Sequence, residues 1–143
     1  MKKAISILSI VVTLLSCKTP QHYSIDKLPS HQLYFGSGGG FAAAWNEYLL
    51  LDNGQLFYFN SLTKEKKELK SIEKKEAKNI YKKLAQLNLN SYQLNKTGNM
   101  TYYIREVNNN TSHEVKWAIE QSDVPSEIKS FYQLLQSKVS NHE

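Results

Sequence analysis

The chain has few residues whose types and spacing could perform chemistry. Its four histidines are His22, His31, His113 and His142, and no two have the close spacing of a metal-binding pair. No serine stands in a Gly-x-Ser-x-Gly elbow. Five carboxylates fall on or near expected strands, where a pair could meet in space or each could lie in solvent: Glu47, Asp52, Glu106, Glu114 and Glu120. We therefore expect no metal, no cofactor and no catalytic centre.

Residues 36–40 read Gly-Ser-Gly-Gly-Gly and form a distinctive stretch. Without Cβ atoms, this stretch can bend or let another group approach closely. It could form a nest of N–H groups for an anion, a mobile flap over a pocket, or only a flexible strand connection. A phosphate-binding loop would continue with Lys and Ser or Thr, but Phe41 and three alanines follow. The candidate binding residues are Gly36, Gly38, Gly39, Gly40, Trp45, Tyr48 and Phe59.

The only cysteine, Cys17, follows an N-terminal sequence typical of secretion. Lys2 and Lys3 precede an uncharged, mostly apolar run over residues 4–15, which is too short to be a stable membrane span. The alternative is a buried N-terminal helix of a cytosolic protein. Such a helix would need a polar stripe, and Ser6, Ser9 and Thr13 provide only a weak one.

Leu14-Leu15-Ser16-Cys17 resembles the lipobox of bacterial lipoproteins. The resemblance implies a signal peptide over residues 1–16 and a Cys17 that carries diacylglycerol and a further acyl chain such as palmitate. Residues 17–30 would then be a polar tether, and residues 31–143 a single domain. No acidic cluster follows Cys17, so we expect an outer-membrane anchor that faces the periplasm. The body resembles small uncharacterised lipoproteins of Gram-negative envelopes.

A hairpin is the clearest secondary structure of the expected domain. Residues 48–52 and 55–59 are apolar runs on either side of Asn53-Gly54, a dipeptide that favours a two-residue type I′ turn. That turn would pair Leu51 with Leu56 and Leu49 with Tyr58, and likewise Leu50 with Phe57 and Tyr48 with Phe59. Both faces would be apolar. One would pack on helices, and the other would need more of the chain, a second subunit or a partner.

A lysine-rich helix is expected over residues 72–87, with Ser71 as its N-cap. Its apolar face comprises Ala77, Ile80, Tyr81, Leu84 and Leu87. A separate stripe comprises Lys74, Lys75, Lys78 and Lys82. The stripe could contact anionic lipid or an acidic envelope polymer, or it could be an ordinary solvated helix face. No aromatic residues interleave the lysines, so we expect no nucleic acid.

A second strand pair and a second helix complete the expected fold. Residues 100–107 and 113–119 would pair around a loop at 108–112, with Val115, Trp117 and Ile119 on one buried face. A helix would begin near Val124 with Asp123 as its N-cap and bury Ile128, Phe131, Leu135 and Val139. Including a first strand at 31–35, the order is ββ(β)α-ββα. We predict an α+β fold, in which an antiparallel sheet of about five strands carries two amphipathic helices on one face.

These observations favour a lipid-anchored envelope protein that is a non-catalytic binding module for an envelope protein or polymer. Aromatic anchors beside adaptable glycines are typical of binding sites. The alternative is a small-ligand carrier or small enzyme with a pocket under Gly36–Gly40. The sequence leaves the oligomeric state open.

Overall fold

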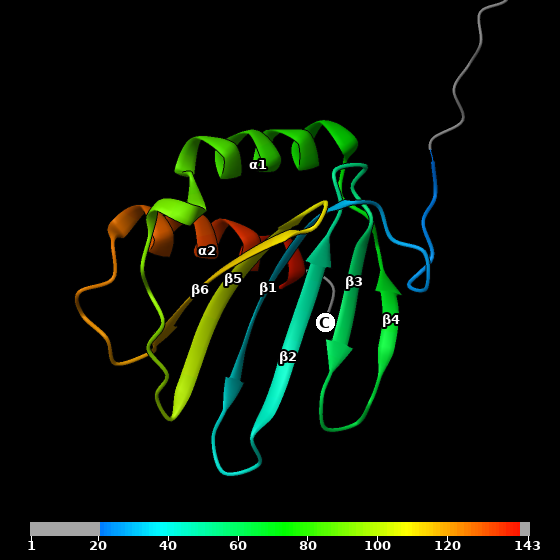
Figure 1. Ribbon diagram of the computed structural model, residues 1–143. Coiled ribbons are helices and arrows are strands. Elements are labelled where there is room, and N and C mark those ends of the chain that lie inside the picture. Colours follow the sequence, from blue (N-terminus) through cyan, green and yellow to red (C-terminus); the bar gives the residue numbers. More distant parts are fainter. Residues whose placement is uncertain (1–20, 141–143) are drawn as a thin grey trace, which may run out of the picture.

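The computed structural model describes residues 21–140, so the predicted signal peptide over residues 1–16 and Cys17 lie outside the described residues. The described chain forms one open antiparallel sheet of six strands with two α-helices, which confirms the α+β class (Figure 1). The strands lie in the order β4-β3-β2-β1-β5-β6. Their bounds are β1 His31–Gly39, β2 Ala44–Leu50, β3 Leu56–Asn60, β4 Lys66–Leu69, β5 Met100–Asn108 and β6 Thr111–Ala118.

Both helices pack on the same face of the sheet. The helices are α1, Lys74–Leu87, and α2, Ser126–Val139, and a short 3-10 turn, Leu89–Ser91, follows α1. The buried stripe of α1 is Ala77, Ile80, Tyr81 and Leu84, and that of α2 includes Ile128, Phe131, Leu135 and Val139. Both stripes join one core cluster with Leu33 and Phe35 of β1 and Ile104 of β5. The predicted apolar faces of the two helices are therefore confirmed, with Leu87 only partly buried.

Both helices begin later than the sequence predicts. Ser71 is not the N-cap of α1, because the Ile72 N–H donates to the Gly54 carbonyl and holds this part of the chain against the hairpin turn. Glu73 is the N-cap and makes no side-chain capping bond. Likewise α2 begins after Pro125 rather than Asp123. In both cases a tertiary contact or a proline fixes the start, and the capping residue nearest in sequence does not.

The predicted register of the β2–β3 hairpin is wrong by one residue. Leu49 pairs with Phe57 and Leu50 with Leu56, because the turn contains three residues rather than two. The Gly54 N–H donates to the Leu51 carbonyl, and the Leu51 N–H donates to the Gln55 carbonyl. Only Gly54 has positive φ in this turn, whereas a type I′ turn needs two such residues. The one-residue slip decides which side chains share a face.

The glycine run is not a loop. Strand β1 continues through Gly36 and Gly38 to Gly39, and the turn to β2 comprises residues 40–43. Because β1 pairs with β2 on one side and β5 on the other, these glycines lie inside the sheet. The interpretation as a mobile flap is therefore overturned.

Three further differences concern strands. The sequence did not predict β4, whose four residues are mostly exposed and lack an apolar alternation. The loop between β5 and β6 is shorter than expected, because β6 begins at Thr111. Val115 and Trp117 are buried as predicted, but Ile119 follows the end of β6 and is 54% exposed.

The second face of the hairpin is covered by the protein's own chain. Leu49, Leu51 and Phe57 form a separate buried cluster, and Tyr23, Ile25 and Leu28 pack against it. The Tyr23 N–H donates to Gln55 Oε1 (2.8 Å), and Gln55 Nε2 donates to the Tyr23 carbonyl (3.0 Å). The sequence predicted that residues 23–28 belong to the tether. In the structure they lie on the sheet.

Candidate binding site

Residues 23–28 leave half of the second face of the sheet, the face away from the helices, uncovered. This open half is built around the glycines of β1. Gly36 lies between Glu47 of β2 and Tyr103 of β5. A Cβ atom at Gly36 would lie only 2.1 Å from the Asn46 carbonyl oxygen. With no side chain between them, the Tyr103 hydroxyl donates a hydrogen bond to Glu47 Oε2 across β1. The glycine brings together two groups that are distant in sequence.

Trp45 packs against Gly38, the next glycine of β1 on this face. Gly38 pairs with Trp45, and a Cβ atom at Gly38 would lie 2.2 Å from the Trp45 ring. The indole therefore lies against the backbone of β1, and its ring meets the ring of Tyr103 edge-on at 5.7 Å. Trp45 remains partly exposed. This arrangement presents a rigid aromatic side chain on the open half of the face.

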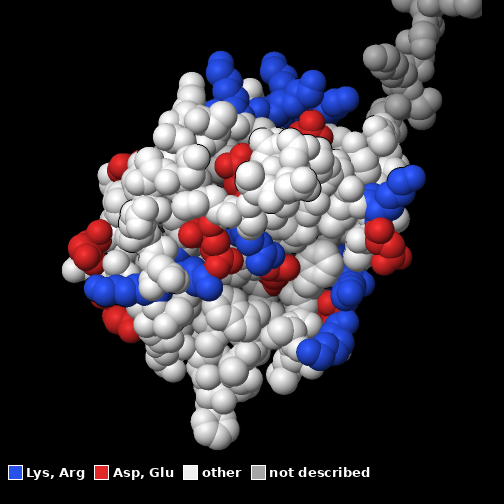
Figure 2. Space-filling view, viewed as in Figure 1, with Lys and Arg blue, Asp and Glu red and all other residues white. Residues whose placement is uncertain are grey.

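Charged side chains form a balanced network beside the indole. Arg105 Nη2 donates to Glu47 Oε2 (2.9 Å), and Arg105 Nη1 lies 3.7 Å from Glu114 Oε2. Lys116 Nζ lies 2.8 Å from the other Glu114 oxygen. The Arg105 guanidinium also stacks over the ring of Tyr34 at 4.5 Å. Figure 2 shows acidic and basic side chains intermixed near the middle of this face.

This network neutralises itself, because two cations face two carboxylates. Burial and the negative charge of Glu47 raise the pKa of Tyr103 well above the ordinary tyrosine value, so Tyr103 stays a neutral hydrogen-bond donor. Glu47 and Glu114 do converge in space, but both are ion-paired with Arg105. The arrangement supplies hydrogen-bonding groups and a planar ring, and it contains no nucleophile with an adjacent free base.

Two shallow hollows lie on either side of Trp45. One, of about 200 Å³, is lined by Trp45, Glu47, Tyr103, Arg105, Glu114 and Lys116. The other, of about 420 Å³, is lined by Trp45, Glu47, Phe59, Asn60, Ser61, Lys64, Glu65 and Lys66. Typical small-ligand pockets hold roughly 300–1,000 Å³ and enclose most of their ligand. The hollow over the glycine run is below that range.

Apolar side chains gather at one end of the sheet, which we call the Trp45 end. The turn at 40–43, the turn at 61–65 and the end of β6 all lie there, because Gly39 pairs with Met100 and the Ile119 N–H donates to the Met100 carbonyl. Among the described residues, the exposed large hydrophobic side chains are Phe41, Leu62 and Ile119, one in each of these segments. Phe41 is fully exposed and Leu62 is 62% exposed. Neither Phe41 nor Leu62 was a candidate binding residue from the sequence, because exposure in a turn leaves no periodic pattern.

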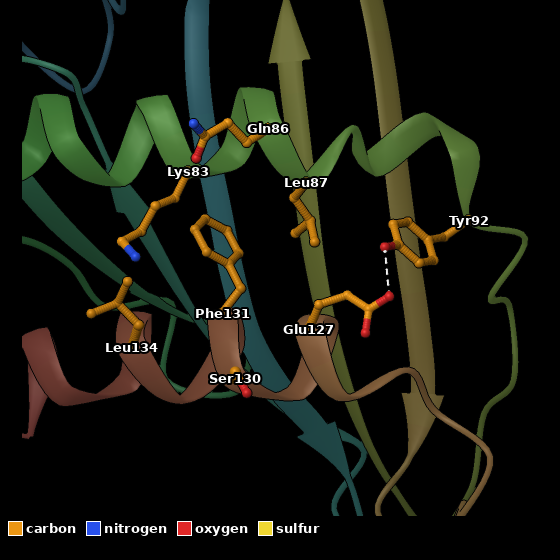
Figure 3. Close-up of a pocket in the computed structure, with 8 residues that line it drawn as sticks. All are labelled: Lys83, Gln86, Leu87, Tyr92, Glu127, Ser130, Phe131 and Leu134. Atoms are coloured by element: carbon orange, nitrogen blue, oxygen red, sulfur yellow. Dashed lines mark hydrogen bonds between the residues drawn. The ribbon is translucent and has the colours of Figure 1, made fainter.

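A groove of about 690 Å³ lies between α1 and α2. In Figure 3, Phe131 points from α2 toward α1 and Leu87 points from α1 into the groove. At one end, the Tyr92 hydroxyl donates to Glu127 Oε1 (3.0 Å). Backbone and side-chain donors, including this hydroxyl, lower the pKa of Glu127. Leu87, Phe131 and Leu134 provide the apolar part of the groove lining, and Lys83, Gln86 and Ser130 line it as well. The described chain provides no segment that fills the groove.

The structure separates the predicted binding residues into two groups. Trp45 and Phe59 share the second face, where both line the larger hollow. Tyr48 lies on the opposite face, where it is buried and stacks on Phe35 at 5.4 Å. Tyr48 is therefore a core residue, and its assignment to the binding surface is wrong. Gly36 and Gly38 allow neighbouring groups to approach the backbone of β1 closely. Gly39 and Gly40, which have positive φ, lead into the turn between β1 and β2.

Within residues 21–140, the histidines form no metal-binding group and the helices no membrane-spanning segment. His31 pairs with Glu106 at 2.8 Å and lies edge-on to the ring of Tyr81. Within residues 21–140, no three His, Cys, Asp or Glu side chains are grouped so that they could hold a metal ion. Neither α1 nor α2, the helices of this described part, is long and apolar enough to cross a membrane.

Comparisons with known proteins find no family model and no curated sequence that matches the chain. The geometry described above is therefore the basis for a functional assignment.

Proposed function

We propose that this protein is a lipid-anchored, non-catalytic interaction module of the cell envelope, whose Trp45 end binds a partner protein. The observation that carries the proposal is the gathering of Phe41, Leu62 and Ile119 at one end of the sheet. Single exposed apolar residues are common on any surface, but a group of them beside a rigid indole is typical of protein interfaces. The anchor in the proposal is acylated Cys17, on the periplasmic side of the outer membrane.

The chemistry of the open face favours binding over catalysis. Trp45 is held by β1 and Tyr103, so little side-chain entropy is lost when a partner covers it. The balanced charges of Glu47, Arg105, Glu114 and Lys116 can form the polar rim that surrounds an apolar interface core.

The partner would contact side chains rather than extend the sheet. On one edge, β4 has only four residues and begins with Lys66 and Lys67, which are exposed. On the other edge, the Lys116 N–H donates to the Leu94 carbonyl, and the Lys96 N–H donates to the Lys116 carbonyl. Short, lysine-bearing or covered edges resist the addition of a foreign strand.

The competing proposal is a small-ligand carrier or small enzyme that uses the hollow over Gly36. One observation favours it, namely that Glu47 and Glu114 converge there on Arg105. A carbohydrate polymer of the envelope would also suit an indole beside hydrogen-bonding groups. Both alternatives predict that binding depends on Trp45 and Arg105 but not on Phe41 or Leu62.

Photo-crosslinking in intact cells tests the proposal. A photoreactive amino acid would replace Phe41 or Leu62 in the full chain, since both side chains are exposed in turns and their replacement leaves the sheet intact. Gln133, which is exposed on α2, is the matched control site. We expect the same protein to be crosslinked from positions 41 and 62 and not from position 133.

A second experiment distinguishes the alternatives. The variant Phe41→Ser/Leu62→Ser should lose the crosslinked partner in affinity capture, whereas Arg105→Lys should retain it. Loss with Arg105→Lys and retention with Phe41→Ser/Leu62→Ser would reverse the assignment in favour of the hollow. Crosslinks of equal yield from positions 41, 62 and 133 would contradict a specific interface.

A further inference from the structure

We infer that α1 lies on the surface of the bilayer, with its lysine stripe against anionic phospholipid, and that the Trp45 end therefore points away from the membrane. This inference rests on the proposed acylation of Cys17. It assigns a partner to a surface that the sequence leaves open between a membrane contact and a solvated helix face.

The chain toward Cys17 leaves the described domain at the turn between β2 and β3. The carbonyl of Gln21, the first described residue, accepts a hydrogen bond from Asn53 Nδ2 (2.8 Å) in the β2–β3 turn. Cys17 stands four positions before Gln21, so even a fully extended chain would place it at most about 14 Å away. The lipid anchor must therefore attach near this turn.

Helix α1 begins beside the same turn. Gly54, next to Asn53, accepts a hydrogen bond from the Ile72 N–H (3.0 Å). A Cβ atom at Gly54 would lie 3.5 Å from the backbone nitrogen of Lys74, the first residue of α1. We call this end of the sheet the Gly54 end. A helix of 14 residues is about 21 Å long, so all of α1 lies near the anchor.

The exposed face of α1 is positively charged. Lys74, Lys75, Lys78 and Lys82 are all exposed, and within residues 21–140 we find no ion pair to any of them. The acidic Glu76 of the same helix is already paired with Lys138 at 2.6 Å. Figure 2 shows basic side chains gathered along the edge of the molecule where Figure 1 places α1.

Three carboxylates reduce the positive charge at this end: Asp52 and Glu73 are exposed there, and the exposed Glu68 accepts a hydrogen bond from Gln55 beside the same turn. The four stripe lysines still exceed them, and Lys70 and Lys83 add to the excess. The potential of an anionic bilayer extends about one Debye length, roughly 8–10 Å at physiological salt. The tether holds α1 within reach of that potential. An untethered domain of modest charge would rarely come so close to the bilayer.

The geometry also orients the opposite end. Strands β1, β2 and β3 each run between the Gly54 end and the Trp45 end, so Phe41 and Leu62 lie a strand length away from α1. With α1 on the bilayer, these side chains point toward the periplasm or the opposite membrane. The orientation therefore leaves the proposed interface accessible.

Lysine footprinting tests the orientation. The native acylated protein would be added to preformed vesicles of phosphatidylcholine, with or without phosphatidylglycerol, and its lysines acetylated and counted by mass spectrometry. We expect the stripe lysines to react about fivefold more slowly on the anionic vesicles, and the difference to vanish at high salt. Lys64 and Lys66, near the Trp45 end, should react equally on both vesicles.

Matched variants make the result specific. The stripe variant is K74Q/K75Q/K78Q/K82Q, and the control of equal charge is K64Q/K66Q/K67Q/K96Q. After acylation, only the stripe variant should lose the extra affinity for anionic over neutral vesicles. Equal reaction of the stripe lysines on both vesicles, while the protein remains bound, would overturn the orientation alone. Failure of the native protein to float with neutral vesicles would instead refute the anchor.

Discussion

The indole of Trp45 lies against the backbone of β1 at Gly38, where a Cβ atom would be 2.2 Å from the ring. This contact explains why a glycine stands in the middle of a central strand, where glycine is otherwise unfavourable. It also couples the most prominent side chain of the proposed interface to the sheet.

The Gly38→Ala substitution tests this contact directly. The added methyl group must displace the Trp45 ring, and we expect a loss of about 1–3 kcal/mol in the free energy of unfolding. The indole NMR signal of Trp45 should shift, and that of buried Trp117 should not. Ala42→Val, in the exposed turn, is the control that should change neither quantity. An unshifted Trp45 signal in Gly38→Ala would contradict the contact.

Gln55 should hold residues 23–28 on the sheet through its hydrogen bonds to Tyr23. It is 4% exposed and bonds both the N–H and the carbonyl of Tyr23. Gln55→Ala leaves these backbone groups without their partner, so we expect a loss of about 1–3 kcal/mol. Hydrogen exchange at Tyr23 should become faster, whereas Gln86→Ala, on an exposed part of α1, should leave it unchanged. Slow exchange at Tyr23 in Gln55→Ala would show that apolar packing alone holds the segment.

The ion pair between Arg105 and Glu47 should contribute modestly to stability. Both side chains are about 30% exposed, so solvent screens their attraction. A double-mutant cycle with Arg105→Met and Glu47→Gln should give a coupling of about 0.5–1 kcal/mol by urea denaturation. Glu65 and Lys67, whose side chains are more exposed, form a comparison pair for which we expect less. Equal couplings for the two pairs would contradict the role assigned to burial.

Stability should decrease at alkaline pH. Burial raises the pKa of Tyr81, Tyr103 and Tyr132 above the ordinary value of 10.0 in the folded protein. Above about pH 10 the unfolded chain therefore loses protons that the folded chain retains, and the free energy of unfolding falls as the pH rises. Each tyrosine contributes a slope of about 1.4 kcal/mol per pH unit.

The Tyr103→Phe variant isolates one of these slopes. Its unfolding free energy should fall less steeply between pH 10 and pH 11.5, by about 1.4 kcal/mol per unit. Tyr92→Phe, where the ring lies at the groove, should change the slope less because Tyr92 is more accessible. Identical slopes for Tyr103→Phe and the unaltered protein would contradict the raised pKa of Tyr103.

Cys17→Ser should release the protein from membranes or leave it unprocessed. The hydroxyl cannot form the thioether, so neither the diacylglycerol nor the later acyl chain would be attached. Membrane fractionation and the intact mass of the protein measure the two effects. A Cys17→Ser protein that is still processed and membrane-bound would refute lipidation.

The periodic patterns of the sequence predicted the elements whose structure is locally determined. The apolar stripes of α1 and α2 follow from helical spacing, and Val115 and Trp117 follow from strand alternation. These patterns were sufficient to predict the α+β class, because each amphipathic element must bury one side. The lipobox is likewise a continuous motif, and it stays a prediction.

Turn geometry and contacts between distant residues decided several structural features that the sequence left open or predicted wrongly. The register of β2 and β3 depends on one extra turn residue, and the start of α1 depends on a bond from Ile72 to Gly54. The alternation of Tyr23 and Ile25, followed by Leu28, was a weak signal for a covering segment. Only the position of Gln55 shows where it packs.

For the candidate site as well, the sequence predicted some features and the tertiary structure decided the others. Trp45 and Phe59 could be chosen from their types alone, but the sequence could not show that Tyr48 faces the helices, because a residue's face depends on the pairing register. Nor could it show that Glu47, Tyr103 and Arg105 meet over Gly36, since residue 36 brings them together only when β1 lies between β2 and β5. Composition and periodicity determine which elements form, whereas tertiary pairing determines which side chains share a surface.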